Sequence, residues 1–384
     1  MSTDMQVKFS VDVEQKELAE ALEWAARALP ARAANPAFAG VRVRTEDDQL
    51  VVSATDGEQS ARASVTLPDI PVETLDVVVP GLLLVNLVKA LPKGVVTFTR
   101  EGDGQLTVTG KRSTFGLPVM PAANVPTVPD MPPVLGVMSA QAFSMAVHTV
   151  AQAASRDDLL PVLTGVQVTL DPATQTASFA ATDRYRLAEM TIPYTPEPGA
   201  AAFAGLIKAK TLDTYAKGAD QDGYITWHSD NDAIAGVTAS GRTATTRQLS
   251  GEFPDYKKLI TAAESEHTLS VPIADTLDAV KRVALVIDQH SGPVKLSVSG
   301  STVVLSAAGT ADGAEAGDTV DDATLTGLDE FTISFNPSLL TDALNAAEGN
   351  TATFAITSSS KAVLLRNTGQ DDPNLTYLLM PMKA

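Results

Sequence analysis

Internal repetition constrains this sequence more than any other feature, because one module of helices and strands occurs three times along the chain. Three stretches carry apolar residues three and four positions apart, which is the spacing of the buried face of an amphipathic helix. In the first stretch these residues are Leu18, Leu22, Ala25 and Leu29. The predicted helices occupy residues 14–29, 139–156 and 273–287. Such a repeat predicts units of similar topology.

Two short strands are predicted after each of these helices. The first module has AGVRV at residues 39–43 and LVVSATDG at 50–57, and the second has TGVQV at 164–168 and ASFAATDR at 177–184. This near identity at almost equal spacing supports the repeat. The third copy lacks the Thr-Asp pair and is predicted at residues 294–298 and 303–308.

A second helix and two further strands complete each module. The helices are predicted at residues 80–91, 208–217 and 336–347. The strands are predicted at residues 95–100, 105–109, 224–228, 233–238, 351–357 and 362–366. Helices and strands in this order indicate an α+β fold. The joins are Pro-rich or polar, so we place domains at residues 1–127, 134–262 and 266–384.

Composition excludes several classes of protein. There is no cysteine, which excludes disulfides and thiol chemistry and fits a reducing cytoplasm. The first residues lack the apolar core of a signal peptide, and no stretch approaches the ~20 apolar residues of a membrane span. The four histidines are scattered without the spacing of metal ligands. We therefore expect a cytoplasmic protein without a membrane contact or a cofactor.

Four segments resemble the beta subunit of bacterial DNA polymerase III, the beta sliding clamp family. They are PVLTGV at residues 161–166, ATDRYRLA at 181–188, EFPDYKKLI at 252–260 and YLLMPMKA at 377–384. The segments occur in the family's order, and the three-module plan covers the whole chain. Any one of them alone is a weak signal, but four in register make a strong one.

The resemblance implies a fold and a function. Two subunits of this family close head to tail into a ring of six domains, with helices lining the channel and sheets outside, which makes the protein a homodimer. It implies a processivity factor, and not an enzyme, that encircles double-stranded DNA without sequence specificity, associates with DNA in the cytoplasm and slides. Its expected partners are the DNA polymerase III catalytic subunit, the clamp loader and other proteins with a clamp-binding motif.

The resemblance also implies an apolar pocket for partner peptides between the second and third domains. Its expected residues are Leu163, Thr182, Arg184, Tyr185, Arg186, Leu187, Pro254, Lys258, Leu259, Asn336, Leu339, Ala362, Leu378, Leu379, Met380, Pro381 and Met382. At Leu163, Leu187 and Leu259 an ordinary role in a domain core is an open alternative.

The predicted helices should carry the basic residues that face DNA. The net charge of −18 argues against a tight nucleic-acid site, but a sliding ring needs only a weakly positive inner surface. The expected DNA-binding residues are Arg27, Arg32, Lys89, Lys93, Arg156, Lys208, Lys210, Lys217, Lys281 and Arg282. Solvated surface cations are the alternative interpretation for each.

The sequence departs from the family pattern at four positions. Arg184 and Tyr185 replace Gly-His, which adds bulk and charge at the pocket rim; Lys258 replaces an arginine, and Leu339 replaces an aromatic residue. These changes imply an altered preference for partner peptides and weak binding of inhibitors directed at the pocket. The acidic, Gly- and Ala-rich residues 309–327 are expected to form a mobile loop.

Two rival functions are weighed against the clamp. An enzyme could use Asp56, Asp183, Asp255 or the Asp157-Asp158 pair to hold Mg²⁺. However, Asp residues in repeated Thr-Asp turns usually accept hydrogen bonds from the backbone. The sequence also contains no phosphate-binding loop, nucleophile elbow or zinc-protease helix. The other rival is an adaptor that does not bind DNA, and clustering of the basic residues on one surface would separate the two.

Overall fold

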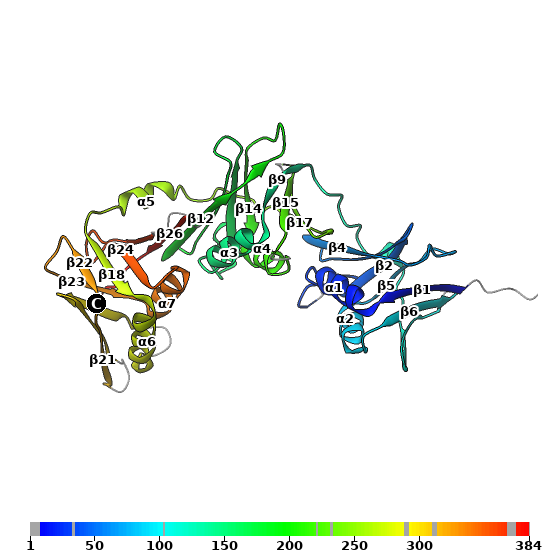
Figure 1. The fold of residues 1–384 in the computed structure, drawn as a ribbon, viewed down its shortest axis with the longest axis horizontal. Helices are drawn as coiled ribbons and strands as arrows, with labels where there is room; N and C mark the ends of the chain where they lie inside the picture. Colours follow the sequence, from blue (N-terminus) through cyan, green and yellow to red (C-terminus); the bar gives the residue numbers. More distant parts are fainter. Residues whose placement is uncertain are drawn as a thin grey trace, which may run out of the picture. The chain divides into compact units, whose positions relative to one another are not determined.

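The computed structural model describes residues 8–32, 35–102, 104–219, 222–230, 233–287, 292–308, 313–366 and 374–383. The chain divides into two compact units, and the middle module is shared between them. Unit 1 contains residues 1–141, 195–201 and 214–248, and unit 2 contains residues 142–194, 202–213 and 249–384. The helices and strands of both are drawn in Figure 1.

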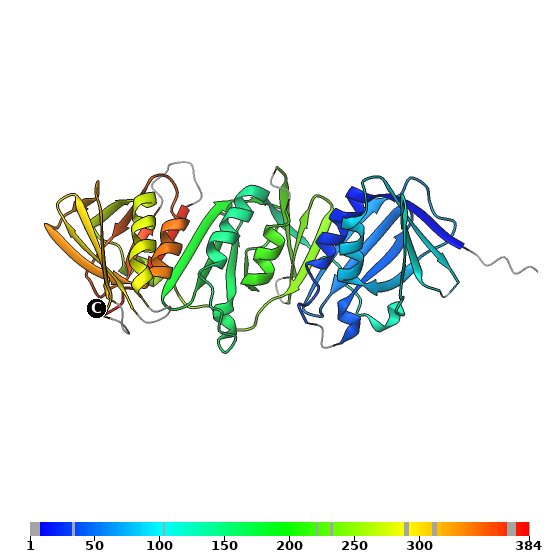
Figure 2. The ribbon, with the colours of Figure 1, turned by 90° about the horizontal axis from the view of Figure 1, so that it is seen from below.

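Unit 1 is built on a nine-stranded sheet of order β13-β9-β15-β16-β17-β4-β3-β2-β5 and a four-stranded sheet of order β1-β6-β7-β8. Its strands are β1 (Lys8–Glu14), β2 (Gly40–Glu46), β3 (Gln49–Thr55), β4 (Gln59–Thr66), β5 (Asp76–Pro80), β6 (Val95–Glu101), β7 (Leu106–Gly110), β8 (Ser113–Leu117), β9 (Val134–Ser139), β13 (Thr195–Pro196), β15 (Tyr224–Ser229), β16 (Ile234–Ala239) and β17 (Arg242–Arg247). Its helices α1 (Gln15–Ala26) and α2 (Gly81–Ala90) lie side by side, and α1 packs on β3 and β4 (Figure 2).

Unit 2 repeats this plan with sheets of order β14-β10-β11-β12-β26-β25-β24-β18-β22 and β21-β20-β19-β23. Its strands are β10 (Gly165–Asp171), β11 (Thr176–Thr182), β12 (Arg186–Pro193), β14 (Phe203–Lys208), β18 (Thr268–Pro272), β19 (Val294–Ser299), β20 (Thr302–Ala308), β21 (Glu315–Val320), β22 (Thr324–Thr326), β23 (Glu330–Phe335), β24 (Thr351–Ala355), β25 (Val363–Arg366) and β26 (Asn374–Leu379). Its helices are α5 (Lys257–Ala262), α6 (Ile273–Val283) and α7 (Pro337–Ala346), while α3 (Ala140–Ala151) and α4 (Ala209–Ala216) cross the division between the units.

The six helices predicted from apolar spacing are confirmed, as α1, α2, α3, α4, α6 and α7, with ends shifted by a few residues. In α1 the residues Leu18, Leu22 and Ala25 are fully buried, as the amphipathic pattern requires. The twelve strands predicted in the three modules are also present. Among the described residues, no helix is long and apolar enough to cross a membrane.

The interpretation of residues 309–327 as one mobile loop is wrong for its described part. Residues 315–320 form β21, which pairs with β20 from Val303↔Val320 to Ala308↔Glu315, and residues 324–326 form β22. Hydrogen bonding to a neighbouring strand fixes an extended backbone here, although the side chains have low β propensity. Residues 309–312 of this stretch lie outside the described residues.

Each nine-stranded sheet joins strands from two modules at one antiparallel pair. In unit 1, β4 of the first module pairs with β17 of the second, from Thr243↔Arg62 to Thr246↔Gln59. In unit 2, β12 of the second module pairs with β26 of the third, from Arg186↔Leu379 to Thr191↔Asn374. The two joins therefore use equivalent strands of the repeat.

Two neighbouring leucines of α2 test this packing. Leu84 is fully buried and Leu83 is 50% exposed. Leu84→Ala should lower the free energy of unfolding by about 2–5 kcal/mol, because it removes buried methyl groups and leaves a cavity. Leu83→Ala should change it by less than about 0.5 kcal/mol. Urea unfolding of both variants measures this, and equal losses would contradict the assigned faces of α2.

Candidate functional site: an apolar cavity on unit 2

The turn after β11 positions the first part of the site. Thr182 donates its hydroxyl to the Arg186 carbonyl over 2.6 Å. The Asp183 carboxylate accepts hydrogen bonds from the backbone N–H groups of Tyr185 and Arg186, at 2.9 and 3.0 Å. In this conformation Arg184 has a φ of 80°, in the left-handed region that favours glycine.

The first module contains the same turn. Thr55 donates to the Gln59 carbonyl over 2.8 Å, and the Asp56 carboxylate accepts from the backbone N–H groups of Glu58 and Gln59. The residue with positive φ is here Gly57. The interpretation of the Thr-Asp pairs as turn formers is confirmed, because Asp56 and Asp183 both bind backbone N–H groups. Among the described residues, no three His, Asp or Glu side chains are grouped in a way that could hold a metal ion.

A cavity of about 480 Å³ opens beside this turn, within the range of small-molecule and peptide sites. Its lining comes from the short turn before β10, the β11–β12 turn with the start of β12, the segment from Pro254 through α5 to Ala263, the loop before β25, and the end of β26 with Met380 after it. Ten residues expected from the sequence line it: Leu163, Thr182, Arg184, Arg186, Leu187, Pro254, Leu259, Ala362, Leu378 and Met380. The structure thus brings together residues from distant parts of the chain.

The cavity floor is continuous with the protein core, while its rim is open. Leu187 and Leu378 are buried and belong to one hydrophobic cluster with Tyr256 and Ile260. Leu259 is 56% exposed and Met380 is 41% exposed, so both present apolar surface to solvent. The exposed fractions of these side chains show which of the three leucines also belong to the domain core. Leu163 and Leu187 are also core residues, whereas Leu259 is not.

Arg186 fixes the β11–β12 turn to α7. Its side chain is only 8% exposed, and it binds Asp183 at 3.0 Å and Asp342 of α7 at 2.5 Å. Burial lowers the pKa of this guanidinium, but Tyr377 and the two carboxylates raise it above its ordinary value. Its charge is therefore compensated inside the protein.

The segment that enters α5 is held on β12 by Glu189. The Tyr256 hydroxyl donates to the buried Glu189 carboxylate over 2.7 Å, and the Lys257 ammonium binds the same oxygen. Burial raises the pKa of Tyr256, and the Glu189 carboxylate raises it further. The hydroxyl therefore stays protonated and keeps donating, which fixes one cavity wall.

Seven expected residues do not line the cavity. Side chains of a strand alternate between the two faces of its sheet, so Leu379 points away from Leu378 and is 1% exposed in the core. Asn336 caps α7, where its side chain accepts from the N–H groups of Ser338 and Leu339. The exposed Lys258 binds Asp255 at 2.7 Å, which raises its pKa. The others are Tyr185, Leu339, Pro381 and Met382.

Sequence reasoning missed five lining residues. Tyr256, Ala262 and Ala263 belong to the segment around α5, and Ser360 and Lys361 belong to the loop before β25. Tyr256 lies inside the EFPDYKKLI segment, so the motif itself contained this signal. Ser360 and Lys361 follow no periodic pattern, and only the fold brings them to the cavity.

The expected DNA-binding residues are distributed over both units. Arg27 is the one of these ten residues that is not exposed. Its guanidinium donates to the Thr214 carbonyl at 2.8 Å and lies over the Trp24 ring. Burial lowers the pKa of Arg27. Its role inside unit 1 is therefore to join α1 to α4. Lys89 binds Glu23 at 2.5 Å, and Arg282 binds Asp318 at 2.6 Å.

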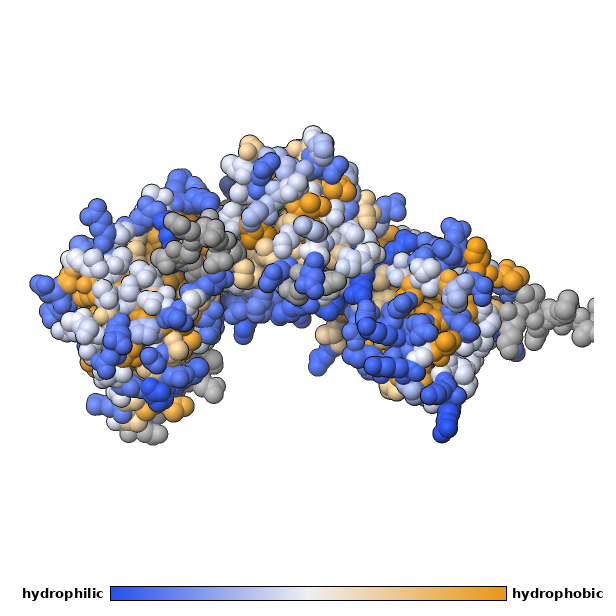
Figure 3. Space-filling view, viewed as in Figure 1, coloured by the Kyte–Doolittle hydropathy of each residue, from blue (hydrophilic) through white to orange (hydrophobic). Residues whose placement is uncertain are grey.

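The remaining expected cations have exposed side chains. Lys281 lies 3.4 Å from Asp278, and Lys208 lies 4.0 Å from Asp158. The others in this group are Arg32, Lys93, Arg156, Lys210 and Lys217. Hydrophilic side chains cover much of the visible face of each unit, with smaller hydrophobic patches between them (Figure 3).

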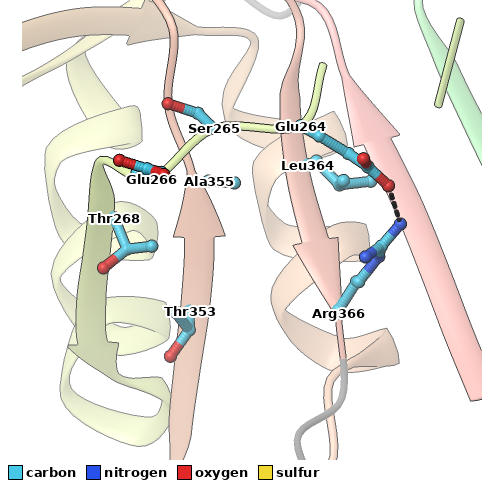
Figure 4. A pocket seen from close by; sticks show the side chains of 8 residues that line it. All are labelled: Glu264, Ser265, Glu266, Thr268, Thr353, Ala355, Leu364 and Arg366. Atoms are coloured by element: carbon cyan, nitrogen blue, oxygen red, sulfur yellow. Dashed lines mark hydrogen bonds and ion pairs between the residues drawn. The ribbon is translucent and has the colours of Figure 1, made fainter. Parts of the chain in front are cut away.

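A second hollow of about 540 Å³ lies over strands β18, β24 and β25. The Arg366 guanidinium forms an ion pair with the Glu264 carboxylate at 2.8 Å on one side of it (Figure 4). Thr268, Thr353, Ser265 and Glu266 give it a polar lining, with Ala355 and Leu364 as its apolar part. None of the residues expected from the sequence lines this hollow.

Comparison with known proteins identifies relatives over the whole chain. Models of the DNA polymerase III beta subunit match at residues 7–129 (N-terminal domain), 137–255 (central domain) and 259–383 (C-terminal domain). The beta sliding clamp of Streptomyces coelicolor is 37% identical over 381 residues, covering 97% of this chain and 99% of that protein. That of Micrococcus luteus is 35% identical, covering 82% of this chain and 98% of that protein.

Solved structures share the fold. The DNA polymerase III beta subunit of Thermotoga maritima superposes with a TM-score of 0.88 at 23% identity, covering 98% of this chain and all of that one. The Pseudomonas aeruginosa sliding clamp bound to griselimycin gives a TM-score of 0.88 at 22% identity with the same coverage. The three-domain α+β architecture expected from the repeat is therefore confirmed.

The ion pair that holds the cavity wall can be tested by substitution. Asp342→Asn leaves the buried Arg186 with Asp183 alone and should lower the free energy of unfolding by about 1–3 kcal/mol. The matched control is Asp278→Asn, which removes an exposed pair and should cost less than about 1 kcal/mol. Urea unfolding compares the two variants. An Asp342→Asn protein as stable as the control would contradict a structural role for this pair.

Proposed function

The chain belongs to the DNA polymerase III beta subunit family of sliding clamps, and we propose that its cavity on unit 2 docks short apolar segments of partner proteins. Members of this family are processivity factors without enzymatic activity. A clamp must hold a polymerase on DNA without competing for the template. A small site for an extended, flexible segment meets that requirement.

The observation that carries this proposal is the combination of apolar walls and open rim in one cavity. Leu187 and Leu378 form a buried floor, and Leu259 and Met380 expose apolar surface that a bound side chain would cover. Exposed leucine and methionine side chains adapt to different occupants, because they have several rotatable bonds. Among the partners we place the replicative polymerase, the clamp loader and other proteins with a clamp-binding motif, which the resemblance to this family implies is a segment of the form Gln-x-x-Leu-Phe.

We also propose that two copies of the chain close into a ring around double-stranded DNA in the cytoplasm. The repeat itself supports this. The join of the first and second modules is β4 with β17, and the join of the second and third is β12 with β26. The equivalent strand of the third module is β21, and that of the first module is β8. Both are edge strands of their sheets in the described chain.

Pairing β21 of one copy with β8 of another would repeat the same join twice more and leave neither edge unpaired. The charges near the two edges are complementary. In an antiparallel join the start of β8 would meet the end of β21. Lys111 and Arg112 precede β8 with exposed side chains, and the exposed Asp321 and Asp322 follow β21. Phe115 of β8 is 40% exposed, which gives the contact an apolar element.

Substitution of two exposed leucines, one inside the cavity and one outside it, tests the docking site. Leu259→Ala removes apolar surface from the cavity and should weaken binding of a Gln-x-x-Leu-Phe peptide about tenfold, because burying such a side chain contributes ~1.5–3 kcal/mol. Leu285→Ala, at a residue that is 84% exposed outside the cavity, should leave the Kd unchanged. Calorimetric titration measures both. Equal affinities for the two variants would exclude this cavity as the docking site.

Ring closure predicts a dimer of about twice 40.1 kDa at micromolar concentration. Phe115→Asp places a charge on the proposed contact and should give a monomer in sedimentation, which slides from nicked circular DNA as readily as from linear DNA. The control Val134→Asp alters a residue of similar exposure, 37%, inside the nine-stranded sheet of unit 1. It should stay dimeric. Monomeric native protein would refute the ring.

A further inference from the structure

Carboxylates hold several of the cations that are expected to face DNA. The Lys89 ammonium in the last turn of α2 lies 2.5 Å from the Glu23 carboxylate of α1. The Arg282 guanidinium of α6 donates to the Asp318 carboxylate of β21 over 2.6 Å, and this hydrogen bond lowers the pKa of Asp318. Two pairs are looser: Lys281 with Asp278 at 3.4 Å and Lys208 with Asp158 at 4.0 Å. At least four of the ten expected cations therefore have an anionic partner within the chain.

These pairs lie at the surface and contribute little to the fold. The side chains of Lys89 and Glu23 are 54% and 42% exposed, whereas that of Arg186, which holds the cavity wall, is 8% exposed. Exposed ion pairs add little to the stability of a protein, because water and salt screen the two charges. Stability therefore does not explain why carboxylates lie beside these cations.

Helix α1 carries two such carboxylates on one side. Glu20 and Glu23 are three residues apart, and each binds a cation of a neighbouring element, Arg242 at 2.9 Å and Lys89 at 2.5 Å. In the last turn of α2 the helix dipole favours a cation without the help of a carboxylate. The position of Lys89 thus does not require Glu23. What Glu23 changes is the availability of this ammonium to other anions.

A carboxylate and a phosphate compete for the same ammonium or guanidinium. Both are anions whose oxygen atoms accept charge-assisted hydrogen bonds. A lysine that already binds a carboxylate must break this pair before it contacts phosphate, so each contact with DNA adds less affinity and dissociates faster. A ring that slides needs contacts of this kind, whereas a tightly bound phosphate would stop it.

We infer that Glu23 and Asp318 act as internal substitutes for DNA phosphate, which occupy Lys89 and Arg282 and thereby weaken the contacts of the ring with DNA. This inference rests on the ring around double-stranded DNA proposed above. The carboxylates determine how strongly the inner surface binds DNA, while closure of the ring keeps the DNA inside it.

Glu23→Gln tests this inference, because it keeps the size of the side chain and removes its charge. The freed Lys89 should bind phosphate. Affinity for a short fluorescent linear duplex, onto which a ring can thread from an end, should rise about two- to fivefold at about 0.1 M salt. The plot of log K against log salt concentration should become steeper by about 0.9, the slope of one additional phosphate contact. Fluorescence anisotropy over a salt series measures both.

Asp76→Asn is the matched control in the same unit. The side chain of Asp76 is 41% exposed and binds Arg42 at 2.6 Å. Val41 lies beside Gly81 of α2, and strand alternation places Arg42 on the opposite face of the sheet. At about 0.1 M salt, charges more than about 10 Å apart are largely screened, so this variant should bind the duplex as the native protein does.

A double variant identifies the cation that is released. Glu23→Gln should raise the affinity in the native background and leave it unchanged in a Lys89→Gln background, since no ammonium is then freed. An equal rise in both backgrounds would assign the effect to the lost charge alone and overturn the inference. Glu23 is a better test position than Asp318, because β21 belongs to the proposed contact between the two copies.

The other outcomes separate this inference from the proposed function. All variants should remain dimers in sedimentation, and dissociation of Glu23→Gln would give the pair a structural role and overturn the inference. If Glu23→Gln and the native protein bind the duplex equally, with equal salt dependence, the inference is wrong and the ring stands. If neither binds the duplex at any salt concentration, the proposed contact with DNA fails and this inference fails with it.

Discussion

The pairing of β12 with β26 is the interaction on which the site of this protein depends. These strands come from different modules, and their backbone hydrogen bonds run from Arg186↔Leu379 to Thr191↔Asn374. They place the β11–β12 turn beside the C-terminal segment, where Met380 donates its N–H to the Tyr185 carbonyl at 2.9 Å. Glu189 of β12 then holds Tyr256 and Lys257 of the α5 segment. Without this join the cavity would lose two of its walls.

The same join also explains why a threefold repeat suits a clamp. The third strand of a module's first half pairs with the last strand of the next module, as β4 pairs with β17 and β12 with β26. A chain of such modules keeps two unlike edges, here β21 and β8, which would pair with a second copy in the ring proposed above. The protein thereby serves as a processivity factor through its topology, and no reacting group is needed.

The sequence predicted the helices and the repeated strand pairs because their apolar spacing is set locally. It left out the other strands, including the joining strands β4, β12, β17 and β26, and read β21 (EAGDTV) as loop. Strands such as β17 (RTATTR) and β21 are specified by hydrogen bonds to their neighbours rather than by their own apolar residues.

The pocket prediction identified segments that line the cavity, but it included residues of those segments whose side chains point away from the cavity. The motif at the C-terminus predicted Leu378, Leu379 and Met380 together, but strand alternation sends Leu379 into the core. Asn336 was predicted in the pocket because of the family resemblance, but its side chain caps the N-terminus of α7. Arg27 had the pattern of a solvated helix cation, yet its burial follows from the packing of α1 on α4, which no local pattern specifies. Ser360 and Lys361 were missed because only the fold brings their loop to the cavity.

A crystal structure of the native protein with a bound Gln-x-x-Leu-Phe peptide tests the central claim most directly. We expect the Leu-Phe side chains to lie against Leu187, Leu259 and Leu378. A peptide seated over the hollow of Glu264 and Arg366, or at any other place with the cavity left empty, would contradict it.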